Sequence, residues 1–343
     1  MKITRAEYSG GSVTMYNDAG FGDIKQLHDI NKTLIFTDEL IFSLHEKKFS
    51  GYTVIKTAGG EPNKTQAEVD RIILQMLELN IDKSWLLVGA GGGVVTDIAG
   101  YVASIYKRGI KLGLAPTTIL GMTDAAIGGK NGVNVGMYKN MVGTTYRPQF
   151  ILYDQSFLDT LPREEFINGF AEIIKHACIK DAAMFEELQN HDINYYIENK
   201  DAAAALVERN IAVKTGIVIS DEYETGERFL LNFGHTFGHA IENLYSLPHG
   251  RAVSIGMVIA AKISESLAGF NPASTKKLAQ LLQQYGLPVS YPFDIDKVTG
   301  LLTRDKKRQG DLINFVLLRD IGDAMVQQLS FEKLRSISEK IIQ

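Results

Sequence analysis

Short apolar runs alternate with amphipathic stretches along the first half of the chain. The runs are rich in branched and aromatic residues and have the length of buried strands; they lie at residues 33–37, 52–56, 85–88, 112–115 and 150–153. Between the second and third runs, apolar residues from Val69 to Leu77 keep the period of a helix. Strands that alternate with helices predict an α/β domain built on a mostly parallel sheet.

The pattern changes near Leu161 and Pro162, where helical periodicity takes over. Helices are expected at residues 163–179, 201–219 and 235–244. Two β-leaning runs near the end, at 313–318 and 325–329, flank a turn and predict a hairpin. We therefore expect an α/β domain over residues 1–161 and an all-α domain with a small β-hairpin over residues 162–343.

The segment 116–148 shows little periodicity and is expected to be a long loop. Loops of this length in a compact domain are often functional. It carries Asp124, Lys130 and Lys139 among glycines and apolar residues, whereas a merely solvated loop would carry more charge. We expect the two lysines to meet anions.

A glycine-rich turn, residues 89–93, joins the strand at 85–88 to a following helix. Free backbone N–H groups at a helix N-terminus suit a phosphate or pyrophosphate. The turn does not fit the GxGxxG pattern, and a simple tight turn explains the glycines alone equally well. Its context favours a ligand, because Glu61, Asp97 and Thr117 also follow expected strand ends, where open α/β sheets bind ligands.

Histidines cluster in the second half of the chain. On the expected helix from residue 235, His235, His239 and Glu242 share one face, and His249 follows shortly after. Neutral imidazole is a common zinc ligand. The spacing is not that of the HExxH proteases, because Thr236 replaces their glutamate. The pattern thus indicates a metal site without indicating a reaction.

A polar stripe marks the helix expected at 163–179. Asn168, Glu172 and Lys175 follow one another at helical spacing. The pattern alone favours a solvated face.

Composition excludes several classes of partner. The 343 residues carry a formal net charge of −4, which argues against a nucleic-acid partner. No apolar run reaches the roughly 18 residues that span a bilayer, and no leader-like apolar stretch stands near Met1. A single cysteine, Cys178, rules out an internal disulfide. We expect a cytoplasmic protein with neither a nucleic-acid nor a membrane partner.

An ordered set of motifs resembles the 3-dehydroquinate synthases of the sugar-phosphate cyclase family. The motifs are GEPNK at 60–64, GGGVVTDIAGYVASIYKRG at 91–109, PTT at 116–118, DAAIGGKNGVN at 124–134, KNMVG at 139–143, FLDTLPREEFINGFAEIIK at 157–175, RFLLNFGHTFGHAIE at 228–242, HGRAVSIGM at 249–257 and DKK at 305–307. They cover most of the chain in the family's order, and the ordered set is far more specific than any single motif.

The resemblance implies an NAD-binding α/β domain, a helical domain that binds metal and substrate, and an active site between them. It implies the conversion of 3-deoxy-D-arabino-heptulosonate 7-phosphate to 3-dehydroquinate and phosphate, in the shikimate route to aromatic amino acids. The implied course is transient oxidation by NAD, β-elimination of phosphate, re-reduction and intramolecular aldol closure. The resemblance further implies that the metal is Zn²⁺ or Co²⁺ and that the substrate is a small sugar phosphate. It also implies that the protein is a homodimer.

The resemblance also implies roles for individual residues. Glu172, His235 and His249 match the metal ligands, and His239 matches a residue near the substrate phosphate. NAD contacts are expected from Asp38, Glu61, Lys64, Gly91, Gly92, Gly93, Asp97, Thr117, Thr118, Lys139, Phe157, Thr160 and Asn168. Substrate contacts are expected from Arg108, Asp124, Lys130, Asn140, Lys175, Lys214, Arg228, Asn232, His239 and Lys307, with Lys306 as the alternative to Lys307. Many are cations, as a substrate with a carboxylate and a phosphate requires.

The sequence departs from the family at a few positions beside matched ones. Arg251 stands where the family often has Glu, Asn131 where Thr is usual, and alanines occupy 125 and 126. Three alternatives therefore remain. One is another sugar-phosphate cyclase, such as one that makes 2-deoxy-scyllo-inosose or an epi-valiolone. The others are an NAD- and metal-dependent oxidoreductase of the glycerol dehydrogenase type and a binding protein without activity.

Overall fold

The computed structural model describes residues 2–136, 138–302, 308–309 and 312–342. The chain divides into two compact units, Met1–Pro162 and Arg163–Gln343, called here the N-terminal unit and the C-terminal unit. The expected substrate residue Lys307 and its alternative Lys306 lie outside the described residues.

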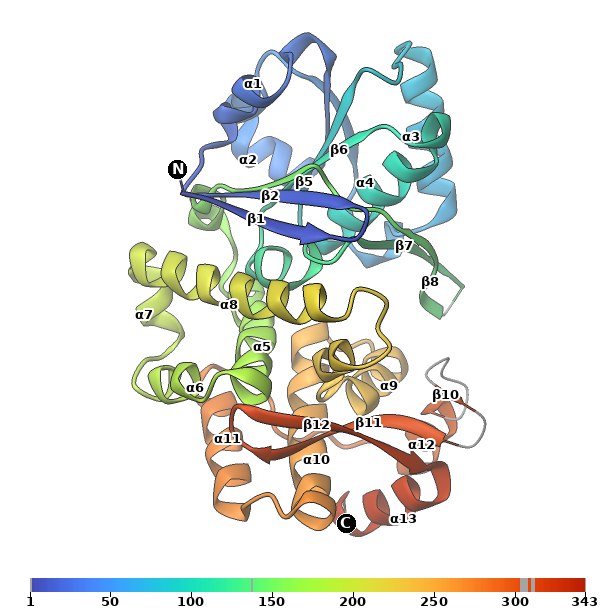
Figure 1. Cartoon of the computed structure of the whole chain (residues 1–343). Helices are drawn as coiled ribbons and strands as arrows, with labels where there is room; N and C mark the ends of the chain where they lie inside the picture. The colour runs from blue at the N-terminus through green and yellow to red at the C-terminus, as the bar shows by residue number, and fades with distance from the viewer. Residues whose placement is uncertain (1, 137, 303–307, 310–311, 343) are drawn as a thin grey trace. The chain divides into compact units, whose positions relative to one another are not determined.

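A seven-stranded sheet organises the N-terminal unit (Figure 1). Its order is β1 (Lys2–Tyr8), β2 (Gly11–Asn17), β9 (Phe150–Tyr153), β6 (Lys111–Pro116), β5 (Leu86–Gly91), β3 (Thr33–Asp38) and β4 (Thr53–Thr57). Only β1 runs antiparallel to its neighbour, so the expectation of a mostly parallel sheet is confirmed. The central strands are buried along nearly their whole length, which explains their continuous apolar runs. The β1–β2 hairpin was not predicted, because most residues of β1 are exposed and it contains no continuous apolar run.

Helices pack against this sheet and begin at its carboxyl edge. Asp38 caps α2 (Glu39–Phe49) by accepting from the Ile41 N–H, and Thr65 caps α3 (Gln66–Glu78). The third, α4 (Gly93–Ile105), begins after Gly92, a residue with no side chain to offer as a cap. The first N–H groups of α4 therefore remain available to a ligand.

The segment 116–148 is more regular than its sequence predicted. It forms a π-helical turn (Gly121–Ala125) and a hairpin of β7 (Lys130–Val135) and β8 (Tyr138–Thr145). The long-loop prediction is thus wrong, and paired glycines explain why. A Cβ on Gly143 would stand 1.9 Å from the carbonyl oxygen of Asn131, so the strands approach through backbone and show little side-chain periodicity.

The C-terminal unit is mostly helical, as predicted. Its helices are α5 (Arg163–Lys180), α6 (Ala182–Gln189), α7 (Ile193–Glu198), α8 (Lys200–Ser220), α9 (His235–Tyr245), α10 (His249–Ala268), α11 (Pro272–Gln284), α12 (Ile295–Leu302) and α13 (Phe331–Ile342). The predicted hairpin is present as β11 (Leu312–Asp320) and β12 (Asp323–Ser330), and the short β10 (Arg308–Gln309) extends it. Helix α10 is central and contacts α5, α9, α11 and β11 (Figure 1).

Within the described part of the chain, no helix combines the length and the apolar character that crossing a membrane requires.

Candidate functional site

The carboxyl edge of the parallel sheet gathers most of the residues expected to bind NAD. Asp38 ends β3, Gly91 ends β5 and is followed by Gly92 and Gly93, and Thr117 and Thr118 follow β6. Thr118 accepts the Gly121 N–H through its hydroxyl at 2.9 Å, which fixes the turn after β6. Burial raises the pKa of Asp38, although hydrogen bonds from α2 N–H groups oppose this rise. The uncapped start of α4 lies at the same edge, so these residues fit a dinucleotide.

A polar network ties the β7–β8 hairpin to this edge. The ammonium of Lys64, which is 4% exposed, contacts Asp97 and lies 2.5 Å from Asn140 Oδ1. Asn134 accepts the Asn140 N–H at 2.9 Å and donates to Glu61 at 2.8 Å. The network therefore joins expected NAD residues to Asn140, a residue expected to meet substrate. Sequence reasoning missed Asn134 as a functional residue, because a lone Asn in a glycine-rich stretch is typical of turns.

Two further expected NAD residues lie on the 3-10 helix Gln155–Thr160, which follows β9. The Phe157 side chain is buried in the core beneath the sheet, and its ring packs edge-on to His45. The Thr160 hydroxyl lies 2.7 Å from His45 Nε2. A contact between Phe157 and a nucleotide would therefore have to come from its backbone.

The remaining substrate candidates of this unit are dispersed. Asp124 belongs to the π-helical turn after β6, at the carboxyl edge. Lys130 is exposed at the start of β7. Arg108 is exposed and precedes β6, so it lies at the amino end of the parallel sheet, opposite Gly92 and Thr117. Within this unit the structure does not bring Arg108 to the other candidates.

Three side chains converge in the C-terminal unit from α5, α9 and α10. Glu172 Oε1 lies 3.5 Å from His235 Nε2 and 3.4 Å from His249 Nε2. Glu172 is fully buried, and His235 is 8% exposed. One possible ligand atom from each of the three lies within 4.8 Å of the others. The structure therefore brings together the residues that the sequence matched to metal ligands.

The spacing of these atoms fits a divalent ion. With metal–ligand bonds of about 2.0–2.1 Å, the ligands of a tetrahedral zinc ion stand about 3.3–3.4 Å apart. One carboxylate and two imidazoles are a donor set that zinc and cobalt accept, and three protein ligands leave a position open for substrate.

The Nδ1 contacts of both imidazoles suit the tautomer that a metal needs. His235 Nδ1 lies 3.1 Å from the carbonyl oxygen of Phe233, and His249 Nδ1 lies 3.1 Å from Glu242 Oε2. An Nδ1–H that donates to such an acceptor leaves the Nε2 lone pair for the ion. Glu242 is buried, and sequence reasoning noted its position on the helix face but gave it no role. A carboxylate three residues after a histidine is common on helices. The spacing of His239 and Glu242 therefore did not indicate that Glu242 would hydrogen-bond a metal-binding histidine.

A second cluster shares one of these histidines. His239, Glu242 and His249 also offer atoms within 4.8 Å of one another. The Glu242 contact with His249 uses Nδ1, the nitrogen whose proton fixes the first site's tautomer. The second cluster is therefore better understood as the support of the first than as another metal site.

Charge inside the cluster follows from burial and pairing. Burial opposes ionisation of Glu172, but the charge of Lys175, together with the neighbouring imidazoles, holds the pKa of this carboxyl well below its usual range. Burial likewise opposes a proton on His249, yet the bonds to Glu172 and Glu242 raise its pKa to about 10. Since a ligand imidazole must be neutral, metal binding here displaces a proton.

The solvated-face interpretation of the α5 stripe is wrong. Glu172 is 0% and Lys175 1% exposed, and the two form an ion pair. A buried charged pair is rare outside functional sites because its desolvation cost is large.

Other expected substrate residues of this unit lie on neighbouring elements. Lys214 of α8 and Arg228 of the 3-10 turn Glu227–Asn232 are buried. Asn232 donates to Glu224 at 3.1 Å. The His239 ring lies 4.9 Å from that of His235, centroid to centroid. The unit that holds the carboxylate–imidazole cluster thus also contains buried cations and an amide among the expected substrate residues.

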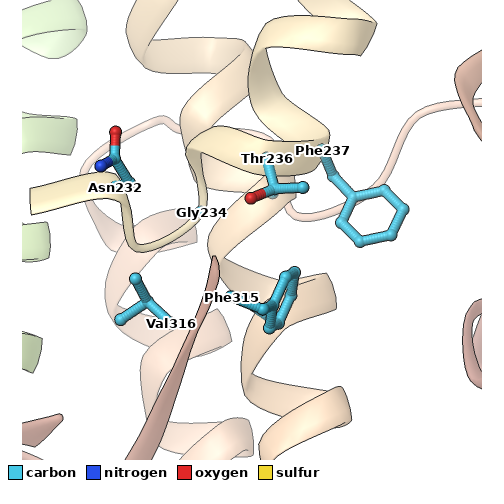
Figure 2. A pocket seen from close by; sticks show the side chains of 8 residues that line it. Asn232, Gly234, Thr236, Phe237, Phe315 and Val316 are labelled. Atoms are coloured by element: carbon cyan, nitrogen blue, oxygen red, sulfur yellow. The ribbon is translucent and has the colours of Figure 1, made fainter. Parts of the chain in front are cut away.

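Glycines let the helices that carry the two histidines meet. A Cβ on Gly256 of α10 would stand 1.9 Å from the carbonyl oxygen of Gly234, the residue before His235. Gly234 has φ of +78°, so glycine is required there as well. Figure 2 shows the turn at Gly234 above Phe315 and Val316 of β11, with Asn232 on one side and Thr236 on the other. Close backbone contact therefore sets the place of His235 relative to α10.

One departure from the family pattern has a structural explanation. Asn131 donates to the carbonyl oxygens of Gly129 and Tyr146, both at 2.8 Å, and covers Gly100 of α4. A Cβ on Gly100 would stand 1.8 Å from Asn131 Oδ1. Asn131 therefore anchors the start of β7 and leaves the candidate site residues untouched.

Comparison with known proteins adds a second line of argument. The model described as 3-dehydroquinate synthase N-terminal matches residues 54–168, and that described as 3-dehydroquinate synthase C-terminal matches residues 169–308. The 3-dehydroquinate synthase of Saccharolobus solfataricus is 36% identical, over 95% of this chain and 94% of its own length. That of Pyrococcus furiosus is 39% identical, over 94% of this chain and 96% of its own length. A solved 2-epi-5-epi-valiolone synthase from Streptomyces hygroscopicus, with NAD⁺ and Zn²⁺ bound, superposes with a TM-score of 0.87 at 27% identity, covering 100% of this chain and 98% of that one.

Proposed function

The chain belongs to the 3-dehydroquinate synthase family, and from this we infer that it converts 3-deoxy-D-arabino-heptulosonate 7-phosphate to 3-dehydroquinate and phosphate. It is a phosphate-eliminating carbon–oxygen lyase that depends on NAD and a divalent metal. The observation that carries the assignment is the match to 3-dehydroquinate synthases along nearly the whole chain, joined to a carboxylate–imidazole cluster with metal spacing.

We propose Glu172, His235 and His249 as the metal ligands. When bound, the ion would supply polarisation of substrate hydroxyls, and NAD would supply reversible hydride transfer. Glu242 and the Phe233 carbonyl hold the two imidazoles with Nε2 turned to the ion. The spacing of the three donor atoms supports this set, and Zn²⁺ or Co²⁺ suits it.

The charged side chains have a binding role in this proposal. Lys175, Lys214 and Arg228 are buried cations that would take the substrate's carboxylate and phosphate, because a desolvated cation binds an anion strongly. Asn232 and His239 would orient the bound sugar phosphate beside the metal. The contacts of Lys64 with Asp97 and Asn140 would hold the β7–β8 hairpin against the carboxyl edge of the sheet, where the cofactor would bind.

A steady-state assay tests the activity. With the heptulosonate 7-phosphate, the protein loaded with NAD and Co²⁺ or Zn²⁺ should release one phosphate per substrate without net accumulation of NADH. Phosphate release from glucose 6-phosphate or sedoheptulose 7-phosphate alone would indicate a different cyclase. One NADH formed per turnover would instead indicate an oxidoreductase of the glycerol dehydrogenase type, and no turnover with any of these substrates would indicate a binding protein.

We further propose that the protein works as a cytoplasmic homodimer. A second copy would bring its Arg108 to a neighbouring carboxyl edge, which Arg108 cannot reach across its own sheet. A free, fully buried thiol at Cys178 suits a reducing compartment. Light scattering should give twice the chain mass of 37.9 kDa, and fractionation should recover the protein with cytoplasmic markers. A fully active monomer would contradict the dimer, and recovery with an oxidising compartment would contradict the location.

A further inference from the structure

The first turn of α10 is paired, residue by residue, with one stripe of α5. On α5 the stripe recurs every four residues, so its members lie one above another on a single face. Three successive residues of α10 meet it in reverse order. The pairs are Arg251 with Glu164 at 2.5 Å, the Gly250 N–H with Asn168 Oδ1 at 2.6 Å, and His249 Nε2 with Glu172 Oε1 at 3.4 Å.

The middle pair supplies a cap that α10 lacks in its own sequence. The N-cap residue of α10 is Pro248, whose ring offers no acceptor for the N–H groups of the first turn. Asn168, on another helix, accepts one of these N–H groups instead. The cap therefore fixes the beginning of α10 to α5, one residue after His249 and one turn before Glu172.

The two helices touch through backbone at this point. A Cβ on Gly250 would stand 2.1 Å from the carbonyl oxygen of Asn168 and 2.8 Å from its Oδ1. Contact this close leaves the α10 N-terminus little freedom to slide along α5. The separation of His249 from Glu172 is consequently set by the Gly250–Asn168 contact.

The outer pair explains the main departure from the family pattern. Arg251 replaces a residue that is often Glu in the family, and a cation in the first turn of a helix opposes the helix dipole. Its partner Glu164 offsets this unfavourable placement. A Glu at position 251 would instead face the like charge of Glu164. Arg251 is partly exposed and Glu164 is exposed, so the pair contributes less than the Asn168 cap.

We propose that Asn168 is a positioning residue for the metal centre, assisted by the Arg251–Glu164 pair. Asn168 caps α10 and thereby holds His249 Nε2 3.4 Å from Glu172 Oε1, a separation at which both atoms could bind one ion. The resemblance matched Asn168 to the NAD contacts. In the structure its side-chain Oδ1 accepts the Gly250 N–H and so joins α5 to α10, two of the helices that carry the proposed ligands. The inference rests on the proposed ligand set of Glu172, His235 and His249.

The test is direct titration of metal-free protein with Co²⁺, followed through the visible absorption of the bound ion. Asn168→Ala should weaken Co²⁺ binding about tenfold to a hundredfold, the range typical of lost outer partners. Asn168→Asp keeps an acceptor oxygen for the Gly250 N–H and should restore binding to within a few-fold of wild type. An absorption band and an affinity unchanged in Asn168→Ala would overturn the proposal.

Ser264→Ala is the matched control. Ser264 lies on the same helix, is fully buried, and accepts the Leu318 N–H at 3.0 Å. It is separated from His249 by about 22 Å of helix, from the rise of about 1.5 Å per residue. Ser264→Ala therefore loses a comparable tertiary hydrogen bond at the far end of α10, and should lower Tm without changing Co²⁺ affinity. Equal loss of affinity in both variants would reduce Asn168 to a general structural role and overturn the proposal.

A charge exchange tests the outer pair without touching Asn168. Arg251→Glu should weaken Co²⁺ binding a few-fold, and adding Glu164→Arg should recover it. Recovery supports the pairing; a double variant as weak as Arg251→Glu alone contradicts it. If wild-type protein did not bind Co²⁺ at all, the proposed metal centre itself would be refuted. If wild-type protein bound Co²⁺ and Asn168→Ala bound it equally well, only the positioning role would be refuted.

Discussion

Replacing His235 with alanine should abolish both metal binding and turnover. His235 Nε2 lies 3.5 Å from Glu172 Oε1, and its Nδ1 faces the Phe233 carbonyl, so the ring has the place and the tautomer of a ligand. Its loss leaves two protein ligands where a catalytic site needs three. The fall in Co²⁺ affinity should therefore exceed the tenfold to hundredfold that outer partners cost. Equilibrium dialysis with metal analysis measures the affinity, and phosphate release measures the rate.

His239→Ala is the informative comparison. His239 lies one turn further along α9, with its ring 4.9 Å from that of His235 and 5.9 Å from that of His249. We propose that it meets substrate, so His239→Ala should retain the metal at near wild-type affinity and lose rate. Equal loss of metal in both variants would contradict the role of His239 and favour the cluster of His239, Glu242 and His249.

The fold could be predicted from local signals where those signals were strong. The buried parallel strands carry continuous apolar runs, so β3, β5 and β9 fell close to the predicted runs. The helices α5, α8 and α9 also begin within a residue of their expected starts. The β7–β8 hairpin escaped prediction because its pairing depends on glycine backbones rather than on alternating side chains.

The candidate site, like the fold, could be predicted from the sequence only in part. Helical spacing placed His235, His239 and Glu242 on one face, but it could not relate them to Glu172, which is far away in the sequence. The polar spacing of α5 even favoured a solvated face, because a one-helix pattern does not reveal that α10 packs on α5 and that Glu172 and Lys175 are buried. Only the resemblance joined Glu172, His235 and His249. The outer contacts by Asn134, Asn168 and Glu242 emerge from tertiary structure alone.

Gly256→Ala should separate α9 from α10 and disturb the metal centre from behind. The added methyl group would stand 1.9 Å from the Gly234 carbonyl oxygen and 2.8 Å from the Gly238 nitrogen, and both neighbours are backbone atoms that cannot rotate away. Overpacking of this kind costs about 1–3 kcal/mol and occasionally more. Because Gly234 adjoins His235, a shift of α9 moves that imidazole away from Glu172. We expect a lower Tm in thermal unfolding and weaker Co²⁺ binding in the same variant.

Gly216→Ala provides the opposite expectation from the same chemical change. Gly216 is exposed on α8, and among the described atoms nothing beyond its own helix lies within 4 Å of an added Cβ. Alanine is the better helix former by about 0.5–1 kcal/mol, so this variant should unfold at a slightly higher temperature and bind Co²⁺ as wild type does. Both effects of Gly256→Ala must therefore come from the α9–α10 contact. A Gly256→Ala protein as stable and as tightly metal-bound as Gly216→Ala would show that this contact does not position His235.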